Sequence, residues 1–104
     1  MGKTQAPKKN LLTEAVLNSD WDGMRNAITR GEELNQVDHH EMTPLLYAIH
    51  RGDLKAVRIL LEYGADPNFN PRTGDGAHAP LWHAEDDFGL AEIGRLLRSF
   101  GAEK

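Results

Sequence analysis

Apolar residues between Thr43 and Asn68 recur at helical spacing in two short runs, separated by Gly52-Asp53. The first run is Leu45, Ala48 and Ile49, and the second is Leu54, Val57, Leu60 and Leu61. Residues three and four positions apart share one face of a helix, so each run predicts a short helix with one apolar face. Two such helices cannot bury these faces alone, and we therefore expect similar hairpins on either side.

Residues at the ends of both runs support these boundaries. Thr43 is a good N-cap, and Pro44 at the first helical position has no N–H to leave unpaired. Gly52 interrupts the helical pattern, and Gly64 stands where a helix usually ends in a left-handed residue. The segment therefore predicts a helix, a tight turn and a second helix.

The pattern occurs twice more in the chain. A shift of 33 residues towards the N-terminus aligns Leu12, Ala15, Val16, Asp20, Trp21, Met24, Gly31 and Asn35 with the central segment. Towards the C-terminus, Pro80, Leu81 and Ala84 align at a shift of 36, and Ile93, Leu96, Leu97, Gly101 and Ala102 at a shift of 37. We expect three repeats at about 10–35, 43–68 and 79–102.

This period, together with the T-P-L-x-x-A and G-A-D sequences of the central repeat, resembles the ankyrin repeat family. The matching residues are Thr43, Pro44, Leu45, Ala48, Gly52, Leu54, Leu60, Leu61 and Gly64 to Asn68. The resemblance covers about Leu11 to Ala102 and implies an all-α solenoid of three helix-turn-helix repeats with β-turn fingers. Residues 11–102 would form that domain, and the polar ends would make it a complete three-repeat unit.

The links between repeats depart from the family pattern. In residues 31–42 the resemblance implies that Asp38 closes the finger by side-chain to backbone hydrogen bonds, but Glu41 stands where the family usually has Gly. The second link, residues 69–79, is three residues longer. Such an insertion can hold specificity or be simple drift in an exposed loop.

The third repeat departs most. One extra residue falls in its helix-to-helix turn, around Asp87 to Gly89. Glu85 and Arg98 stand where the central repeat has Ile49 and Leu61. We expect these charges to keep the end of the stack soluble, as a terminal repeat requires.

Charge divides the chain into two parts. Residues 1–10 carry three lysines and no periodic apolar residue, which predicts a disordered basic leader. The remaining 9 basic and 16 acidic residues give 11–104 a net charge of about −7. This sign disfavours nucleic acid as a partner. The absence of cysteine fits a reducing cytoplasm, and no stretch is long and apolar enough to predict a membrane span.

Candidate chemistry is sparse. His39 and His40 are adjacent on a turn, so we do not expect their side chains to converge on one metal ion. No histidine grouping has an established zinc spacing. Asp86 and Asp87 are better explained as a solvated helix end than as paired acid and base. We expect no metal, no cofactor and no catalysis. Carboxylates beside His50 or His83 would make binding sensitive to pH.

The family resemblance implies a concave binding face formed by the fingers and the first helix of each repeat. Positions on or near this face are the candidate partner-binding residues: Leu17, Asn18, Val37, His39, His40, Met42, Tyr47, His50, Arg51, Phe69, Arg72, Trp82, Asp86 and Asp87. Plain alternatives exist, since Val37 and Met42 can simply cover the turn, and Tyr47 and Trp82 can belong to the core.

We therefore expect a monomeric protein-binding module that acts by occupying its partner. Small ankyrin proteins in bacteria include immunity proteins that neutralise a cognate toxin, and this chain resembles that kind. An acidic body would suit a basic toxin such as a nuclease. The competing interpretation is an adaptor or inhibitor of a signalling or host protein.

Overall fold

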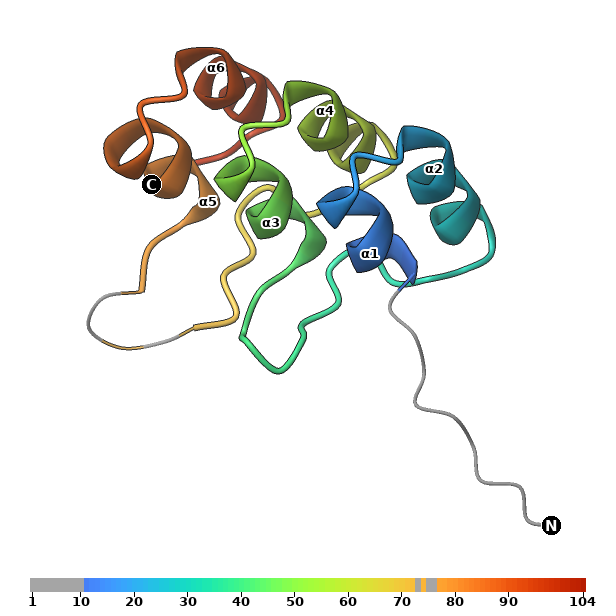
Figure 1. Cartoon of the computed structure of the whole chain (residues 1–104). Helices are drawn as coiled ribbons and strands as arrows, with labels where there is room; N and C mark the ends of the chain where they lie inside the picture. The colour runs from blue at the N-terminus through green and yellow to red at the C-terminus, as the bar shows by residue number, and fades with distance from the viewer. Residues whose placement is uncertain (1–10, 73, 75–76) are drawn as a thin grey trace, which may run out of the picture.

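The computed structural model describes residues 11–72, 74 and 77–104, and no strand occurs among them (Figure 1). The predicted leader 1–10 and residues 73, 75 and 76 of the second link lie outside the described residues. The helices are α1 (Leu11–Leu17), α2 (Trp21–Thr29), α3 (Pro44–His50), α4 (Leu54–Glu62), α5 (Pro80–Trp82), the π-helix η1 (His83–Asp87) and α6 (Ala91–Ser99). The all-α prediction is confirmed.

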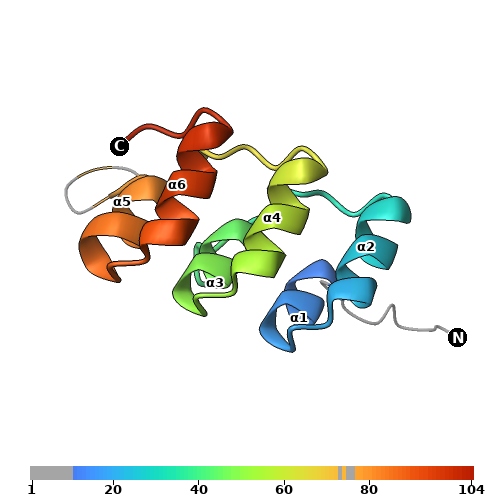
Figure 2. The same cartoon turned by 90° about the horizontal axis from the view of Figure 1, so that it is seen from above.

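The helices form two layers. Helices α1, α3 and α5 with η1 make an inner layer, and α2, α4 and α6 make an outer layer, as Figure 2 shows from above. The links between repeats leave the stack on the side of the inner layer (Figure 1). Helix α3 contacts its own partner α4 and also α1, α5 and η1, so the central hairpin is packed on both sides.

The apolar stripes predicted from the sequence are buried between these layers. Ala48, Ile49, Val57 and Leu60 in the central hairpin all have 0% of their surface exposed. Their counterparts Leu12, Val16, Met24, Leu81 and Leu97 in the outer repeats are equally buried. The two ends of the stack supply the neighbours that the central hairpin needs, which is the arrangement that a repeat array requires.

Side chains cap the N-termini of α2, α3 and α4. The Thr43 hydroxyl oxygen accepts the N–H of Leu46 at 3.1 Å, and Asp53 Oδ1 accepts the N–H of Ala56 at the same distance. Asp20 caps α2 in the same way. In the third repeat Leu90 occupies the position of Asp53, and α6 begins without a side-chain cap. The helix starts therefore become weaker towards the C-terminal end.

Polar links one period apart join neighbouring repeats. Asn35 Oδ1 accepts the N–H of Asp66 at 3.0 Å. One period later, Asn68 Oδ1 accepts the N–H of Glu103 at 2.7 Å, and its amide nitrogen donates to the carbonyl of Gly101. The asparagines found by the 33-residue shift thus satisfy backbone groups of the following repeat.

The first finger is a tight turn fixed to α3. Asp38 Oδ1 accepts the N–H groups of His40 and Met42 at 2.9 and 3.0 Å, and Oδ2 accepts the hydroxyl of Tyr47. Glu41 has a φ of 61°, in the left-handed region that favours glycine. The glutamate therefore adopts the backbone conformation that the family's glycine would adopt, and the turn closes.

The extra residue of the third repeat lies inside a helix, not in the following turn as we expected. The N–H of Phe88 bonds to the carbonyl of His83 at 3.1 Å, five residues back, within the π-helix η1. Gly89 has a φ of 65°, matching the 66° of Gly52 in the central repeat. The turn itself is therefore of normal length, and a widened helical turn absorbs the insertion.

The last repeat ends in an ion-pair network. Arg98 donates two hydrogen bonds to the carboxylate of Glu85, at 2.8 and 2.9 Å, and Lys104 lies 3.3 Å from the same group. Hydrogen bonds from Arg98 lower the pKa of Glu85 to about 2. Gly94 makes room for this carboxylate, since a Cβ there would lie 2.6 Å from it. Charged groups thus replace the apolar contacts of Ile49 and Leu61.

Leu60→Ala tests the stacking of the central hairpin. Leu60 is fully buried at the centre of the array, so its truncation should cost about 2–5 kcal/mol of unfolding free energy by opening a cavity. Urea unfolding followed by circular dichroism measures this loss. A cost below that of an exposed substitution such as Glu62→Ala would contradict the assignment of Leu60 to the core.

Tyr47→Phe tests how the finger is held. Loss of the hydrogen bond to Asp38 should cost about 0.5–1.5 kcal/mol. Burial, with the hydrogen bond and charge of Asp38, raises the pKa of Tyr47 from 10.0 to about 12. The stabilisation is therefore complete below pH 10 and is lost as the pH rises towards 12. Unfolding curves between pH 8 and pH 12 should show this decline in the native protein and not in the variant.

Candidate functional site

The first finger presents its side chains to solvent. His39 and His40 are exposed, Val37 is 46% exposed, and Met42 is half-buried. The two imidazole rings lie with their centroids 4.0 Å apart. Among the described residues, no group of three or more His, Asp or Glu side chains could hold a metal ion.

Tyr47 lies at the base of this finger and is half-buried. Burial opposes ionisation of Asp38, but hydrogen bonds from Tyr47 and from the backbone of Met42 and His40 outweigh it and lower the pKa of that carboxyl. A charged Asp38 thus holds both the turn and the tyrosine. Tyr47 therefore positions the finger, and its contact with a partner stays a prediction.

Arg72 joins the second link to the first finger. Its guanidinium lies 3.3 Å from the Glu41 carboxylate and donates to the carbonyl of His40 at 3.4 Å. Phe69, at the start of the same link, is half-buried. Arg72 therefore holds the described part of the second link against the first finger, although its side chain remains more than half exposed.

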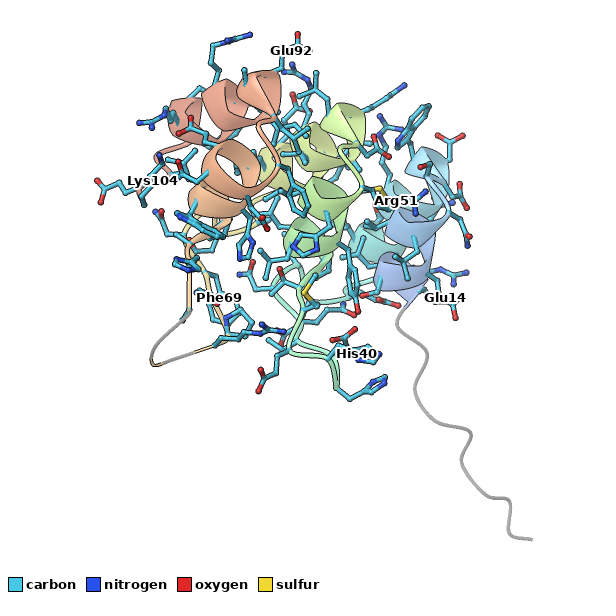
Figure 3. All side chains as sticks on the ribbon, turned by 60° about the vertical axis from the view of Figure 1, so that its left-hand side comes forward. Glu14, His40, Arg51, Phe69, Glu92 and Lys104 are labelled. Carbon is cyan, nitrogen blue, oxygen red and sulfur yellow. The ribbon has the colours of Figure 1, made fainter. Side chains whose placement is uncertain are left out.

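Arg51, Leu17 and Asn18 lie at the ends of inner-layer helices and are exposed. Figure 3 shows His40 at the tip of the first finger and Arg51 at the opposite end of α3. Within the described residues Arg51 forms no ion pair. The predicted residues Asn18 and Arg51 therefore present polar side chains at the C-terminal ends of α1 and α3.

Aromatic rings and imidazoles gather where the third repeat meets α3 and the second link. We name this group the ring cluster: His50, His78, Trp82, His83 and Phe88. The centroid of His50 lies 5.3 Å from that of His83 and 4.9 Å from that of Phe88. His78 stacks on Trp82 at 3.7 Å, and Trp82 lies 5.2 Å from His83. Trp82 and His50 were predicted as contact residues, but Phe88 was not.

The extra residue in repeat three was the one feature of the sequence that could have identified Phe88 as a member of the ring cluster. Because the insertion was expected to sit in the turn, Phe88 was counted as a turn residue. The π-helix instead carries Phe88 to the side of His50, where the phenyl ring is 42% exposed.

The adjacent carboxylates Asp86 and Asp87 of η1 face different partners. Asp86 lies 3.0 Å from the ammonium of Lys104, whereas Asp87 lies 3.8 Å from Nδ1 of His83. Burial lowers the pKa of both His50 and His83, and the charge of Asp87 opposes this shift in each. Burial thus favours the neutral form of His50 and His83.

A shallow groove of about 530 Å³ lies on the open face of repeat one. Its walls are Leu11, Glu14, Ala15, Asn18, Asp20, Gly23, Asn26, Ala27, Thr29 and Arg30. Gly23 and Asn26 stand where the central repeat has Ala56 and the buried Ile59. The hollow thus results from small and polar residues on a helix face that, in the central repeat, packs on a neighbour.

No helix in the described residues has the length and apolar character that would let it cross a bilayer.

Comparison with known proteins shows the same repeats. A family model of three ankyrin repeats matches residues 6–104. XBAT34 of Arabidopsis thaliana, a candidate E3 ubiquitin-protein ligase, is 36% identical over 98% of this chain and 27% of its own length. XBOS34 of Oryza sativa, a probable E3 ubiquitin-protein ligase, is 35% identical over 94% of this chain and 19% of its own length.

The ankyrin repeat domain of Bcl-3, a member of the IkappaB protein family, superposes with a TM-score of 0.77 at 28% identity. The match covers 88% of this chain and 39% of the Bcl-3 chain. The chain spans about a fifth to a quarter of the length of the two plant relatives. Both matches cover nearly all of this chain and therefore include its three repeats. With two helical layers, fingers on the inner side and a family model matching nearly its whole length, this protein belongs to the ankyrin repeat family.

Proposed function

We propose that this protein is a non-catalytic module that binds a partner protein through the fingers and the inner layer. The observation that carries the proposal is the fixed first finger. Asp38 ties its backbone to Tyr47, and Arg72 ties it to the second link, while His39 and His40 remain exposed. A surface ordered in advance loses less conformational entropy when it binds.

The charge of the body supports a basic partner surface. Residues 11–104 carry about −7, and opposite charge on a partner would speed association and favour the complex. A finer form of the proposal is an immunity protein that occupies a basic toxin, such as a nuclease, and thereby blocks it. In this form the module needs no chemistry of its own, since occupancy is sufficient.

The second candidate is an adaptor or inhibitor of a signalling or host protein. The observation that favours it is the pair of plant relatives, in which the matching repeats are a minor part of a longer protein named as a ligase. In such proteins the repeats would select a target for the rest of the chain. Both candidates use the same binding face and differ in what the partner is.

Purification of the tagged protein with its cellular partner tests the proposal and separates the two forms. A stoichiometric protein partner is expected. A neighbouring secreted toxin would support the immunity form, and a signalling or scaffold component would support the adaptor form. Recovery of the protein alone, together with turnover of a substrate by the purified chain, would contradict the proposal.

Substitution of exposed inner-face residues should separate binding from folding. His40→Ala and Arg51→Ala leave the buried core and the backbone contacts of the finger intact. Each should therefore leave the melting temperature nearly unchanged and cost about 1 kcal/mol or more of binding to the captured partner. Isothermal titration calorimetry with that partner measures the change in binding free energy.

The matched control is Arg58→Ala, which removes an exposed arginine from α4 in the outer layer. Binding should be unaffected by this change. If Arg58→Ala weakens binding as much as Arg51→Ala does, the inner layer is not the binding face.

A further inference from the structure

The π-helix of repeat three ends at an exposed carboxylate, which an exposed aromatic residue follows in the chain. Asp87 and Phe88 are adjacent at its end, with the Asp87 side chain 45% and Phe88 42% exposed. Glu85 and Asp86 of the same helix are already paired with Arg98 and Lys104. Among the described residues, no lysine or arginine pairs with Asp87.

Asp87 lies beside His83, and Phe88 lies beside His50, whose ring is 5.3 Å from that of His83. An exposed carboxylate and an exposed ring on one such cluster suit a cationic side chain. A guanidinium or ammonium can pair with the carboxylate and lie against the ring, and each contact strengthens the preference for positive charge. Lys55 of this chain already makes the ring part of such a contact, with its ammonium 4.3 Å from the centroid of Trp21. The net charge of about −7 on residues 11–104 favours the same sign of ligand.

His83 lies behind this carboxylate. Its Nδ1 is buried, has no hydrogen-bond partner, and lies 3.8 Å from Asp87 Oδ2. A protonated imidazole would need an acceptor for that N–H, and Asp87 is the carboxylate within reach. Protonation of His83 would therefore draw Asp87 into an internal ion pair and reduce its attraction for an outside cation.

We propose that Asp87 and Phe88 anchor a lysine or arginine side chain of the partner protein, and that protonation of His83 releases this anchor. The inference rests on the proposed function and adds the chemistry of one contact and its dependence on pH. The π-helix is essential to it, because the widened turn places Asp87 and Phe88 beside His50 and His83.

The direction of the pH effect follows from the groups around His83. Burial and the charges of His50 and His78 lower the pKa of His83, while Asp87 raises it. For His50, burial and Arg72 of the second link lower the pKa, and Asp87 raises it. Both imidazoles gain their protons below the ordinary pKa of 6.5, so the anchor is intact at pH 7.5 and is lost as the pH falls towards 5.

A short peptide tests the anchor without knowledge of the partner. The probe is acetyl-Gly-Arg-Gly-Arg-Gly-amide, and its control replaces both arginines with neutral citrulline. In heteronuclear NMR titrations of the full chain at pH 7.5, the arginine peptide should shift the resonances of Phe88 and His50, and the citrulline peptide should not. Asp87→Asn should abolish these shifts.

Asp86→Asn is the matched control, because it removes the same charge one residue away from a carboxylate that Lys104 already holds. It should leave the peptide shifts in place. Equal shifts in the Asp87→Asn and native proteins, or no shifts with the arginine peptide, would overturn the proposal.

His83→Gln tests the control by pH. In the native chain, peptide affinity should fall about two- to fivefold between pH 7.5 and pH 5.0, the size of one exposed ion pair. The variant should bind at pH 7.5 and lose most of this dependence. The same spectra give the pKa of His83, which should fall in Asp87→Asn, and an unchanged value would contradict the ion pair.

The captured partner separates this inference from the proposed function. If the partner binds and Asp87→Asn binds it as tightly as the native chain, the anchor is wrong and the binding function stands. If purification recovers the protein alone and the purified chain turns over a substrate, the binding function itself fails.

Discussion

Each helical hairpin of this chain can bury its apolar face only against another hairpin, and the rest of the structure depends on this constraint. Helices of seven to nine residues are too short to be stable alone in water. Stacking side by side buries Ile49 and Leu60 completely and leaves the two end faces to be made polar. In repeat one, small and polar residues line a groove on the end face. In repeat three, the Glu85–Arg98 ion pair takes the place of apolar contacts.

The same constraint explains why the residues of the proposed binding face lie mostly outside the core. The core needs apolar residues at fixed positions in the helices. The finger tips and the ends of the inner helices contribute little to the packing of this core. Local hydrogen bonds then order the exposed part, as Asp38 does for the first finger. Polar links such as Asn35 to Asp66 fix the spacing between repeats, so a contact on one repeat is held in register with the next.

Most of the fold could be predicted from residues with one strong local role. Thr43, Pro44, Asp53 and Gly64 mark helix ends, and the 33-residue shift identified Asp20 and Gly31 as copies of Asp53 and Gly64. The π-helix could not be predicted, because a length difference shows that a residue is extra but not which backbone hydrogen bonds absorb it. The side-chain pairs Tyr47–Asp38 and Arg72–Glu41 were missed for a related reason, since they join segments whose approach depends on the folded stack.

The most direct test of the stacking claim is the far-UV circular dichroism of the isolated central hairpin, residues 43–68, against that of the full chain. This segment contains both helices and both side-chain caps of the best-formed repeat. If its helices depend on their neighbours, the peptide should be largely unstructured in water and show no cooperative melting. A peptide that is helical and melts cooperatively on its own would contradict the account.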